Sequence, residues 1–377
     1  MSTVIVGAGQ AGLATASHLG RLGRPAVVLD ARHRVGDSWR ERYDSLRLFS
    51  PAMADGLPGL PFPGPRHEFP TARQMGDYLE EYAAAMELPV RTGVRVERVS
   101  RRPGGGFSVE TSDGAVDADD VVVATGGHTR PHVPDLAREL DPTIVQLHST
   151  EYRNPGQLQE GPVLVVGASH SGADLALEAA ADHETYLAGQ IRGQVPVVGS
   201  GGVADVVADH IIMFAAMHVL TLRTPVGRRL APRFRHHGAP LERPKRADLE
   251  RAGVVLLPHR ATGCRDGLPV LDDGRVLDVR NVLWCTGFSE DWSWIEDLPL
   301  AEDGYPRQHR GVVDDVEGLY FMGLPFQYAA ASGLVLGAGR DARYVAEHIA
   351  ARHRAWTAGG RRFGSRVATR TRESQAA

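Results

Sequence analysis

The chain has 377 residues, of which 42% are hydrophobic and 23% charged, with a formal net charge of −4 at pH 7. This length exceeds one compact core of ordinary size and favours two domains, while the slightly acidic balance gives no electrostatic reason to expect nucleic acid or an anionic membrane as the main partner. An apolar strand begins almost at Met1 and no run is apolar enough to span a bilayer, so a cytoplasmic location is expected. Cys264 and Cys285 form neither a metal-ligand pattern nor a CxxC pair. We therefore expect no metal, and any redox chemistry on a bound cofactor.

The stretch from Val4 to Gly12 predicts a buried strand that runs into a Gly-x-Gly-x-x-Gly turn, followed by a helix over residues 13–22. Gly7 allows the tight turn, Gly9 lets the backbone approach a pyrophosphate, and Gly12 lets the helix pack close to the strand. The positive N-terminal end of that helix would face the phosphates. This arrangement predicts a dinucleotide site.

A second apolar strand ends in Asp30, near the offset at which an acid binds the ribose hydroxyls of a dinucleotide. Residues 32–50 are too charged for a core strand and too rich in aromatic residues for a free linker, which favours a segment lying over a ligand. Trp39 would cover a flat ring system. The arginines of this segment either meet phosphate or lie on a solvated face, and both alternatives stay open for Arg32, Arg40, Arg42 and Arg47.

The next segments alternate between loop, helix and strand. Residues 51–70 are rich in Pro and Gly and predict a long loop that shapes a site. Thr71 caps a predicted helix over residues 72–86. Strands are expected at residues 90–99 and 107–111.

A buried strand over residues 121–123 leads into a small-residue turn at 124–127, where the backbone would touch a ligand. Residues 146–152 follow as a crossover to a new domain. His148 in this crossover is either a catalytic base or an anchor that holds the linker by hydrogen bonds, and the anchor is favoured.

Residues 163–172 repeat the opening pattern of strand, small-residue loop and helix, which implies a second dinucleotide site. The middle glycine is replaced by Ser169, which is small and has a hydroxyl that can donate to phosphate. The following strand, over residues 184–188, is not followed by an acid. Arg192 lies nearby, and an arginine without a carboxylate favours a 2′-phosphate and hence NADPH over NADH.

Residues 193–246 depart from the alternation of strands and helices. Residues 203–222 are apolar and helical in length but contain acids. This helix is a lid over the substrate pocket or plain packing, a partner-facing surface, or an in-plane membrane anchor, and the first of these alternatives is favoured.

Residues 282–288 echo residues 121–127, which suggests that the chain leaves its second domain as it left its first. Strand and helix signals at 318–323 and 333–350 then return to the first sheet. The predicted fold class is α/β, with two Rossmann-like dinucleotide-binding domains, the second inserted into the first. The expected division is residues 1–150 and 285–358 for the first domain, 151–284 for the second with a helical insertion at about 193–246, and 359–377 for a disordered tail.

Together these pieces resemble the flavin-containing monooxygenases, the soluble bacterial flavoproteins with two dinucleotide-binding domains that are related to the plant auxin-forming flavin monooxygenases. The resemblance covers nearly the whole chain and rests on residues 7–12, 35–40, 43–51, 124–126, 148–152, 167–172, 285–288 and 318–339. It implies FAD in the first site and NADPH in the second. It also implies that hydride passes to flavin N5, that NADP⁺ stays bound, and that oxygen adds at C4a to form a hydroperoxide that oxygenates the substrate.

The motifs and the resemblance give a set of expected cofactor-binding residues. They are Gly7, Gly9, Gln10, Ala11, Gly12, Asp30, Ala31, Arg32, Ser38, Trp39, Leu46, Val96, Ala124, Thr125, Gly126, Gly167, Ser169, His170, Ser171, Gly172, Arg192, Thr286, Gly287, Gly323 and Gln327.

The chain departs from the family pattern in its linker, where Phe and Gly are replaced by Pro142 and Ile144, and in the flavin pocket, where the family's Asn is Phe49. No catalytic acid or base is assigned. The candidates that would contact the reacting atoms are Phe49, Ser50 and Gln327.

Three functions follow from these features. The leading one is an FAD- and NADPH-dependent monooxygenase that uses molecular oxygen on a small, largely apolar molecule. The others are an NADPH oxidase or flavin reductase on the same fold, favoured by Phe49, and a redox-responsive regulator with 193–246 as its partner surface. The pocket walls are expected from residues 50–62, 193–246 and 325–332, and a homodimer is the default assembly.

Overall fold

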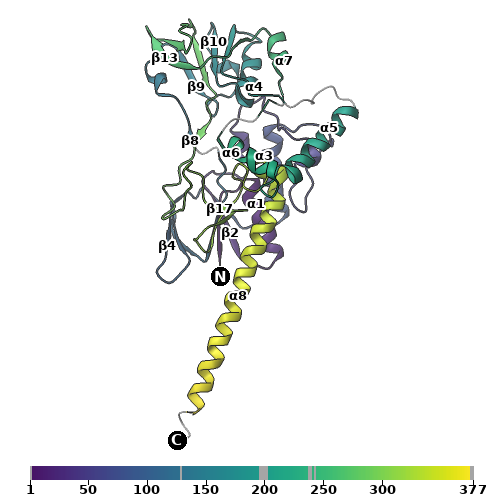
Figure 1. The fold of residues 1–377 in the computed structure, drawn as a ribbon, viewed down its shortest axis with the longest axis vertical. Coiled ribbons are helices and arrows are strands. Elements are labelled where there is room, and N and C mark those ends of the chain that lie inside the picture. Colours follow the sequence, from purple (N-terminus) through teal and green to yellow (C-terminus); the bar gives the residue numbers. More distant parts are fainter. Residues whose placement is uncertain (1, 128–129, 195–202, 237–239, 242, 374–377) are drawn as a thin grey trace.

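The computed structural model describes residues 2–127, 130–194, 203–236, 240–241 and 243–373. Figure 1 shows two lobes, one above the other, and a long C-terminal helix, α8 (Val335–Glu373), that begins against the lower lobe and extends away from it. None of the helices in these ranges is long and apolar enough to cross a bilayer.

The lower lobe is built on a seven-stranded sheet in the order β17-β18-β19-β7-β1-β2-β3. Its strands are β1 (Thr3–Val6), β2 (Ala26–Asp30), β3 (Val90–Thr92), β7 (Asp120–Val123), β17 (Gln308–His309), β18 (Val312–Val313) and β19 (Leu319–Phe321). β1 is parallel to both of its neighbours, with Val6 opposite Leu29 and Val123. All residues of β1 and β7 are buried, as expected for a parallel sheet covered on both faces. The carboxyl end of β1 is therefore the point from which ligand-binding loops diverge.

Three helices pack around this sheet. They are α1 (Gln10–Arg21), α3 (Ala72–Ala85) and the first turns of α8. The predicted cap of α3 is confirmed, because the Thr71 hydroxyl accepts the Gln74 amide and the Gln74 side chain accepts the Thr71 amide.

The upper lobe is built on a five-stranded parallel sheet in the order β12-β11-β10-β15-β9. Its strands are β9 (Val145–His148), β10 (Val163–Val166), β11 (Thr185–Ala188), β12 (Val255–Leu257) and β15 (Asn281–Trp284). Val166 lies opposite Ala188 and Trp284, which reproduces the neighbours of Val6 in the first sheet. α4 (His170–Ala179) and α7 (Arg246–Arg251) pack against each other in this lobe.

Strand membership shows how the chain divides between the lobes. The first sheet takes β1, β2, β3 and β7 and later β17 to β19, whereas the second takes β9 to β12 and β15. The two crossings between the lobes pair with each other through β8 (Arg130–Pro131) and β16 (Phe288–Ser289). β9 pairs with β15 in the second sheet, with His148 opposite Trp284.

Each lobe also carries a smaller antiparallel sheet. The lower lobe has β4 (Val96–Arg101), β5 (Phe107–Thr111) and β6 (Gly114–Ala118), and the upper has β13 (Ala261–Arg265) and β14 (Leu268–Leu271). The predicted strand over 90–99 is thus two strands in different sheets. The short helices are α2 (Asp37–Arg40), η1 (Ala52–Ala54), η2 (Asp135–Arg138), η3 (Pro155–Gln157) and η5 (Ala330–Gly333).

The helical insertion consists of α5 (Val203–Phe214), the π-helical turn η4 (Ala215–Val219) and α6 (Pro225–His236). Its middle is tied to the lower lobe: Thr221 bridges to Ala329, and the Leu222 amide donates to the Tyr328 carbonyl at 2.8 Å. Residues 195–202 and 237–239 of the predicted insertion lie outside the described residues.

The C-terminal segment differs from its prediction. A disordered tail was expected from residue 359, but α8 continues to Glu373. Residues 359–373 contain no proline and five arginines, which favour a helix, and each added residue gains a hydrogen bond once a helix has started.

Candidate cofactor and active site

The first glycine loop is a cradle that only glycine can form. Gly7 has φ +109°, and a Cβ there would lie 2.5 Å from the Ala124 carbonyl oxygen. A Cβ on Gly12 would lie 1.9 Å from the Gly7 carbonyl oxygen, so α1 packs directly on the loop. No side chain caps α1, whose N-cap is Gly9. Its first amides therefore remain available for an anion such as a pyrophosphate.

Asp30 fixes the end of β2 beside this loop. One carboxylate oxygen accepts the Ala8 amide at 2.7 Å, and the other accepts the Arg32 amide at 2.8 Å. The Arg32 side chain pairs with Glu41 at 2.8 Å, and Ala31 is exposed. The backbone amides of residues 93 and 94 donate to the Arg32 and Asp30 carbonyls, and Val96 follows two residues later at the start of β4. The acid predicted for the ribose is thus also a brace for the glycine loop.

Other predicted residues gather at the same end of the sheet. The Trp39 indole N–H donates to the Gln10 side chain at 3.4 Å, which brings α2 and its Ser38 to the start of α1. A Cβ on Gly323 would lie 3.2 Å from the Ala11 Cβ. The turn that contains Thr125 and Gly126 continues from Ala124, the residue that closes on Gly7.

The second glycine loop repeats the geometry of the first. Gly167 also has φ +109°, and its Cβ would lie 2.3 Å from the Cys285 carbonyl oxygen. A Cβ on Gly172 would lie 1.7 Å from the Gly167 carbonyl oxygen. Ser169 is the uncapped N-cap of α4, the place that Gly9 takes in α1, where the structure leaves room for a side chain. His170 and Ser171 form the first turn of α4.

The loop after β11 contains Arg192, which is exposed and whose carbonyl oxygen accepts a hydrogen bond from Arg233 at 3.4 Å. No acid follows β11 before this residue. The guanidinium group of Arg192 is therefore placed on the loop where a second ribose is expected.

His148 anchors the crossover between the lobes. It is 1% exposed, with Nδ1 3.0 Å from the Thr150 hydroxyl and Nε2 3.1 Å from the Gly287 carbonyl oxygen. Burial lowers its pKa. The Thr286 hydroxyl donates to the His132 carbonyl in the same crossover. The prediction that His148 is a linker anchor is confirmed.

The three catalytic candidates have different surroundings. The Phe49 ring stacks on the His170 ring with centroids 4.2 Å apart, and burial lowers the His170 pKa to about 4. The Ser50 hydroxyl donates to the Asp55 carboxylate. Gln327 is fully buried, and its amide oxygen accepts the Leu324 amide at 3.4 Å, so its side chain braces its own loop.

The segment that carries Phe49 is a strap between the lobes, which we define as residues 43–50. The Tyr43 hydroxyl donates to the Asp174 carboxylate of α4 at 2.7 Å, and the Ser45 hydroxyl donates to Glu178 at 3.0 Å. Leu46 packs against core clusters of both lobes. Burial raises the Asp174 pKa to about 6. The strap therefore holds α4 in a fixed relation to the first glycine loop.

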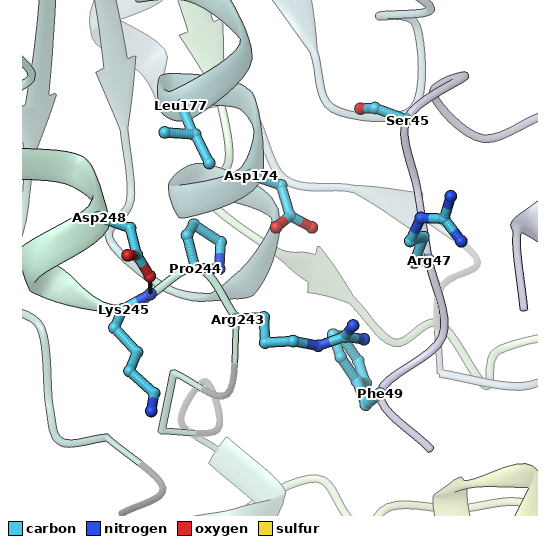
Figure 2. A pocket seen from close by; sticks show the side chains of 9 residues that line it. All are labelled: Ser45, Arg47, Phe49, Asp174, Leu177, Arg243, Pro244, Lys245 and Asp248. Carbon is cyan, nitrogen blue, oxygen red and sulfur yellow. Dashed lines mark hydrogen bonds between the residues drawn. The ribbon is translucent and has the colours of Figure 1, made fainter. Parts of the chain in front are cut away.

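A cavity of about 330 Å³ lies between the strap, α4 and the segment before α7. In Figure 2 the side chains of the strap face those of α4 across this space, and the Arg243 side chain reaches toward Phe49. The Arg243 guanidinium lies 3.6 Å from the Phe69 ring centroid and donates to the Leu48 carbonyl at 2.7 Å. The residues that line the cavity are Ser45, Arg47, Phe49, Asp174, Leu177, Arg243, Pro244, Lys245 and Asp248.

The arginines of residues 32–50 mainly contact protein groups. Arg40 pairs with Asp37, Asp77 and Glu80. Arg47 donates to the Phe69 carbonyl at 3.0 Å. In the described part of the chain, no group of three or more His, Cys, Asp or Glu residues is arranged to hold a metal ion.

Two of the expected pocket walls, the helical insertion and the loop over residues 325–332, are in contact. α6 contacts the loop over residues 325–332, with Phe234 and Phe326 ring centroids 5.5 Å apart, and the Arg235 guanidinium lies 3.9 Å from the Tyr305 ring centroid. His210 of α5 lies 6.5 Å, centroid to centroid, from His67 in the loop over residues 51–70.

Sequence analysis did not identify Asp55, Asp174 or Arg243. Asp174 and Arg243 acquire their roles only through contacts between segments that are distant in sequence, so no local pattern marks them. Asp55 could have been noticed from the sequence, because it is the only acidic residue in the Pro- and Gly-rich stretch of residues 51–67.

Two glycine cradles lie after β1 and β10, each in a sheet whose neighbouring strands are parallel, and comparison with known proteins identifies the family of the chain. Residues 4–188 match the family model described as pyridine nucleotide-disulphide oxidoreductase. An uncharacterized CzcO-like oxidoreductase of Geobacillus kaustophilus is 35% identical over 353 residues, which covers 93% of this chain and 98% of that protein.

A plant enzyme and a solved bacterial structure extend this similarity. The probable indole-3-pyruvate monooxygenase YUCCA3 of Arabidopsis thaliana is 30% identical over 398 residues, covering 93% of this chain and 86% of that protein. The structure of a flavin-containing monooxygenase from Stenotrophomonas maltophilia is 26% identical, with a TM-score of 0.74 and coverage of 93% of this chain and 99% of that one. The chain belongs to the flavin-containing monooxygenase family and is a flavin-dependent oxidoreductase. FAD and NADPH, the cofactors predicted from the sequence, are those of this family.

Proposed function

We propose that the chain is an FAD- and NADPH-dependent monooxygenase that oxygenates a small organic molecule, with FAD on the first glycine loop and NADPH on the second. The oxygen-transfer route implied by the resemblance is part of this proposal. So is the division into a first domain and an inserted second one, which is supported by the return of the chain to the first sheet at β17.

The residues fit these cofactors. Each cradle keeps a helix N-terminus free of side-chain caps and packs it against a loop where a Cβ would collide with a carbonyl oxygen. In the first site, Asp30 lies where the ribose hydroxyls are expected and Trp39 lies beside Gln10. In the second, Arg192 takes the place of an acid and suits a 2′-phosphate.

When bound, the flavin supplies electron transfer from NADPH and the reaction with dioxygen. The chain's own residues orient and shield the two cofactors. The strap fixes α4 against the lower lobe through Tyr43 and Asp174. The loop over residues 325–332 and α6 close one side, which excludes water from the reacting region.

One observation carries the proposal: the Phe49 ring lies on the His170 ring, so the strap that adjoins the first cradle directly contacts the helix of the second. Such a connection is what an enzyme needs when a pyridine nucleotide and a flavin must meet.

The decisive experiment uses ¹⁸O₂. The purified protein with FAD and NADPH is supplied with a panel of amines, sulfides and ketones, and products are examined by mass spectrometry while peroxide is quantified. Incorporation of one ¹⁸O atom per NADPH consumed supports the monooxygenase. If no product carries ¹⁸O and all electrons appear as peroxide, the proposal is wrong.

A specific feature favours the second candidate, an NADPH oxidase. Where the family pattern has an Asn, Phe49 uses its ring for the contact with His170 and offers no hydrogen bond to an oxygen-bearing species. Under this alternative, an F49N variant gains ¹⁸O-labelled product that the wild-type protein lacks.

A further inference from the structure

Asp55 is a buried carboxyl group with one oxygen bonded and the other free. It is 0% exposed and follows η1 in the loop over residues 51–70. Its Oδ1 accepts the hydrogen bond from the Ser50 hydroxyl. Its Oδ2 is buried and has no hydrogen-bond partner among the described residues. A buried carboxylate left in this way is costly, so the arrangement needs an explanation.

The surroundings of Asp55 favour its neutral form. Within the described part of the chain it has no salt bridge, and Ala52 and Leu57 on either side of it are core residues. The titratable group that faces it from α3 is Tyr78, whose hydroxyl is already used by the Leu57 amide at 2.6 Å and the Leu60 carbonyl at 2.7 Å. Burial raises the Asp55 pKa to about 7, and the hydrogen bond from Ser50 opposes this rise.

The Ser50–Asp55 pair lies on the segment that connects the two cradles. Ser50 directly follows Phe49, which stacks on His170. Ala52 and Leu57 pack in the same core cluster as Ala8 and Ala11 of the first glycine loop. The pair is therefore held by rigid contacts to both cofactor sites.

We propose that Asp55 is a positioning residue that sets the direction in which the Ser50 hydroxyl donates its hydrogen. This inference rests on the proposed function, because the group that Ser50 would face is the bound flavin or substrate. The ionised carboxylate only accepts, so Ser50 must donate to it. When the proton is on the carboxyl oxygen that faces Ser50, the neutral carboxyl group donates to the Ser50 oxygen, and the Ser50 hydrogen is free to turn to another acceptor. The proton stays on Asp55 and none is consumed.

The consequence is a hydrogen-bond donor that is present at low pH and withdrawn at high pH. Phe49 offers no polar group, whereas Ser50, the next residue of the strap, has a hydroxyl that can donate a hydrogen bond. A preorganised donor in a water-poor site stabilises developing negative charge. We therefore expect the fraction of NADPH that yields oxygenated product to follow the protonation of Asp55.

The first test measures this coupling fraction from pH 6 to pH 8.5 in the wild-type protein and in D55N and S50A. The wild-type fraction should fall about tenfold between pH 6 and pH 8, as expected for one group that titrates near pH 7. In D55N the amide donates to Ser50 at every pH, so the fraction should stay high and flat. In S50A it should be low and flat. A wild-type pH profile in either variant overturns the proposal.

The second test needs no turnover. The urea midpoint of unfolding is measured from pH 4.5 to pH 8.5. Because the folded-state pKa of Asp55 is above the unfolded value, the folded state binds the proton more tightly and the midpoint should decrease as pH rises through this window. D55N should remove most of that decrease. The control is D113N, at an exposed acid in the turn between β5 and β6, which should keep the wild-type slope.

The two tests separate the inference from the function. If no substrate is oxygenated but D55N removes the pH dependence of the urea midpoint, the monooxygenase proposal fails and the protonation of the Ser50–Asp55 pair stands. Its effect should then appear as a pH-dependent shift of the flavin absorption band, which D55N and S50A abolish. If D55N keeps the wild-type slope, Asp55 does not hold a proton and the inference is wrong whatever the activity.

Discussion

The rings of Phe49 and His170 are in contact, with centroids 4.2 Å apart and an angle of 34° between their planes, and this contact joins the strap of one lobe to the first turn of α4 in the other. Because burial lowers the His170 pKa to about 4, the imidazole is neutral above pH 5 and the contact does not depend on charge in the working range.

Removing this ring should weaken the second cofactor and leave the first in place. Aromatic pairs contribute about 0.5 to 1.5 kcal/mol beyond their buried area, so F49A should raise the KM for NADPH by about two- to tenfold. FAD content, measured by absorbance after gel filtration, should not change. F49Y keeps a ring and is the control. An unchanged KM in F49A would show that the stack does not support the NADPH site.

The glycines of the first loop should separate into two kinds. A Cβ at Gly12 would lie 1.9 Å from a backbone oxygen, whereas a Cβ at Gly9 meets no protein atom within 4 Å. G12A should therefore lower the melting temperature and lose FAD, because the loop itself must move. G9A should keep the melting temperature of the FAD-free protein, so any loss of FAD in it reports contact with the cofactor. Equal melting temperatures of the two FAD-free variants would contradict this distinction.

Arg192 should determine the preference for NADPH. It is exposed, so the expected contribution of its contact with a 2′-phosphate is about 1 kcal/mol, or about fivefold in KM. R192A should raise the KM for NADPH by that factor and leave the KM for NADH unchanged, while R192K should show a smaller effect. The measurement is the KM of flavin reduction for each nucleotide. A parallel rise in both values would assign Arg192 a structural role.

The parts of the fold that follow local rules could be predicted from the sequence. Short sequence motifs predict the glycine loops, the strands that precede them and the Thr71 cap. The similarity between residues 121–127 and 282–288 corresponds to a repeated contact, of Ala124 with Gly7 and of Cys285 with Gly167. The roles of Asp174 and Arg243 could not be predicted, because they depend on how the strap crosses α4. Gln327 was a catalytic candidate by resemblance, yet its side chain is enclosed by its own loop.

The Tyr43–Asp174 bond should make the contact between the lobes sensitive to pH. Burial raises the Asp174 pKa to about 6, above its unfolded value, so ionisation of Asp174 costs stability as pH rises from about 4 to 6. Y43F removes the hydrogen bond that opposes this cost, so it should be less stable than the wild-type protein above pH 6 by about 1.5 to 3 kcal/mol. Near pH 4 the two proteins should differ less. Urea unfolding at both pH values measures the difference, and an equal loss at both would show that the charge of Asp174 is not involved.

Arg340 connects the helical insertion to the loop over residues 325–332. Arg340 of α8 donates to the Met217 carbonyl of η4 at 2.7 Å and lies 4.9 Å from the Tyr328 ring centroid. α5, by contrast, leaves Val207, Ile211 and Phe214 more than half exposed, so these apolar side chains gain little from packing. A helix that buries little apolar surface opens locally with a small free-energy change.

R340A should therefore loosen the insertion without unfolding the lower lobe. Loss of the hydrogen bond to Met217, at about 1 kcal/mol, raises the population of the open form about fivefold. Cleavage within residues 203–222 by a dilute protease should accelerate by at least that factor, because R340A also removes the ion pair between Arg340 and Asp341. FAD content should be unchanged, whereas the melting temperature should fall, because Asp341 is buried and loses its ion-pair partner. R343A, which removes an exposed pair with Glu347 on the same helix, is the matched control and should cleave at the wild-type rate. If R340A and R343A are cleaved equally, the contact with Met217 does not hold the insertion, and its attachment must come from the Thr221–Ala329 bridge instead.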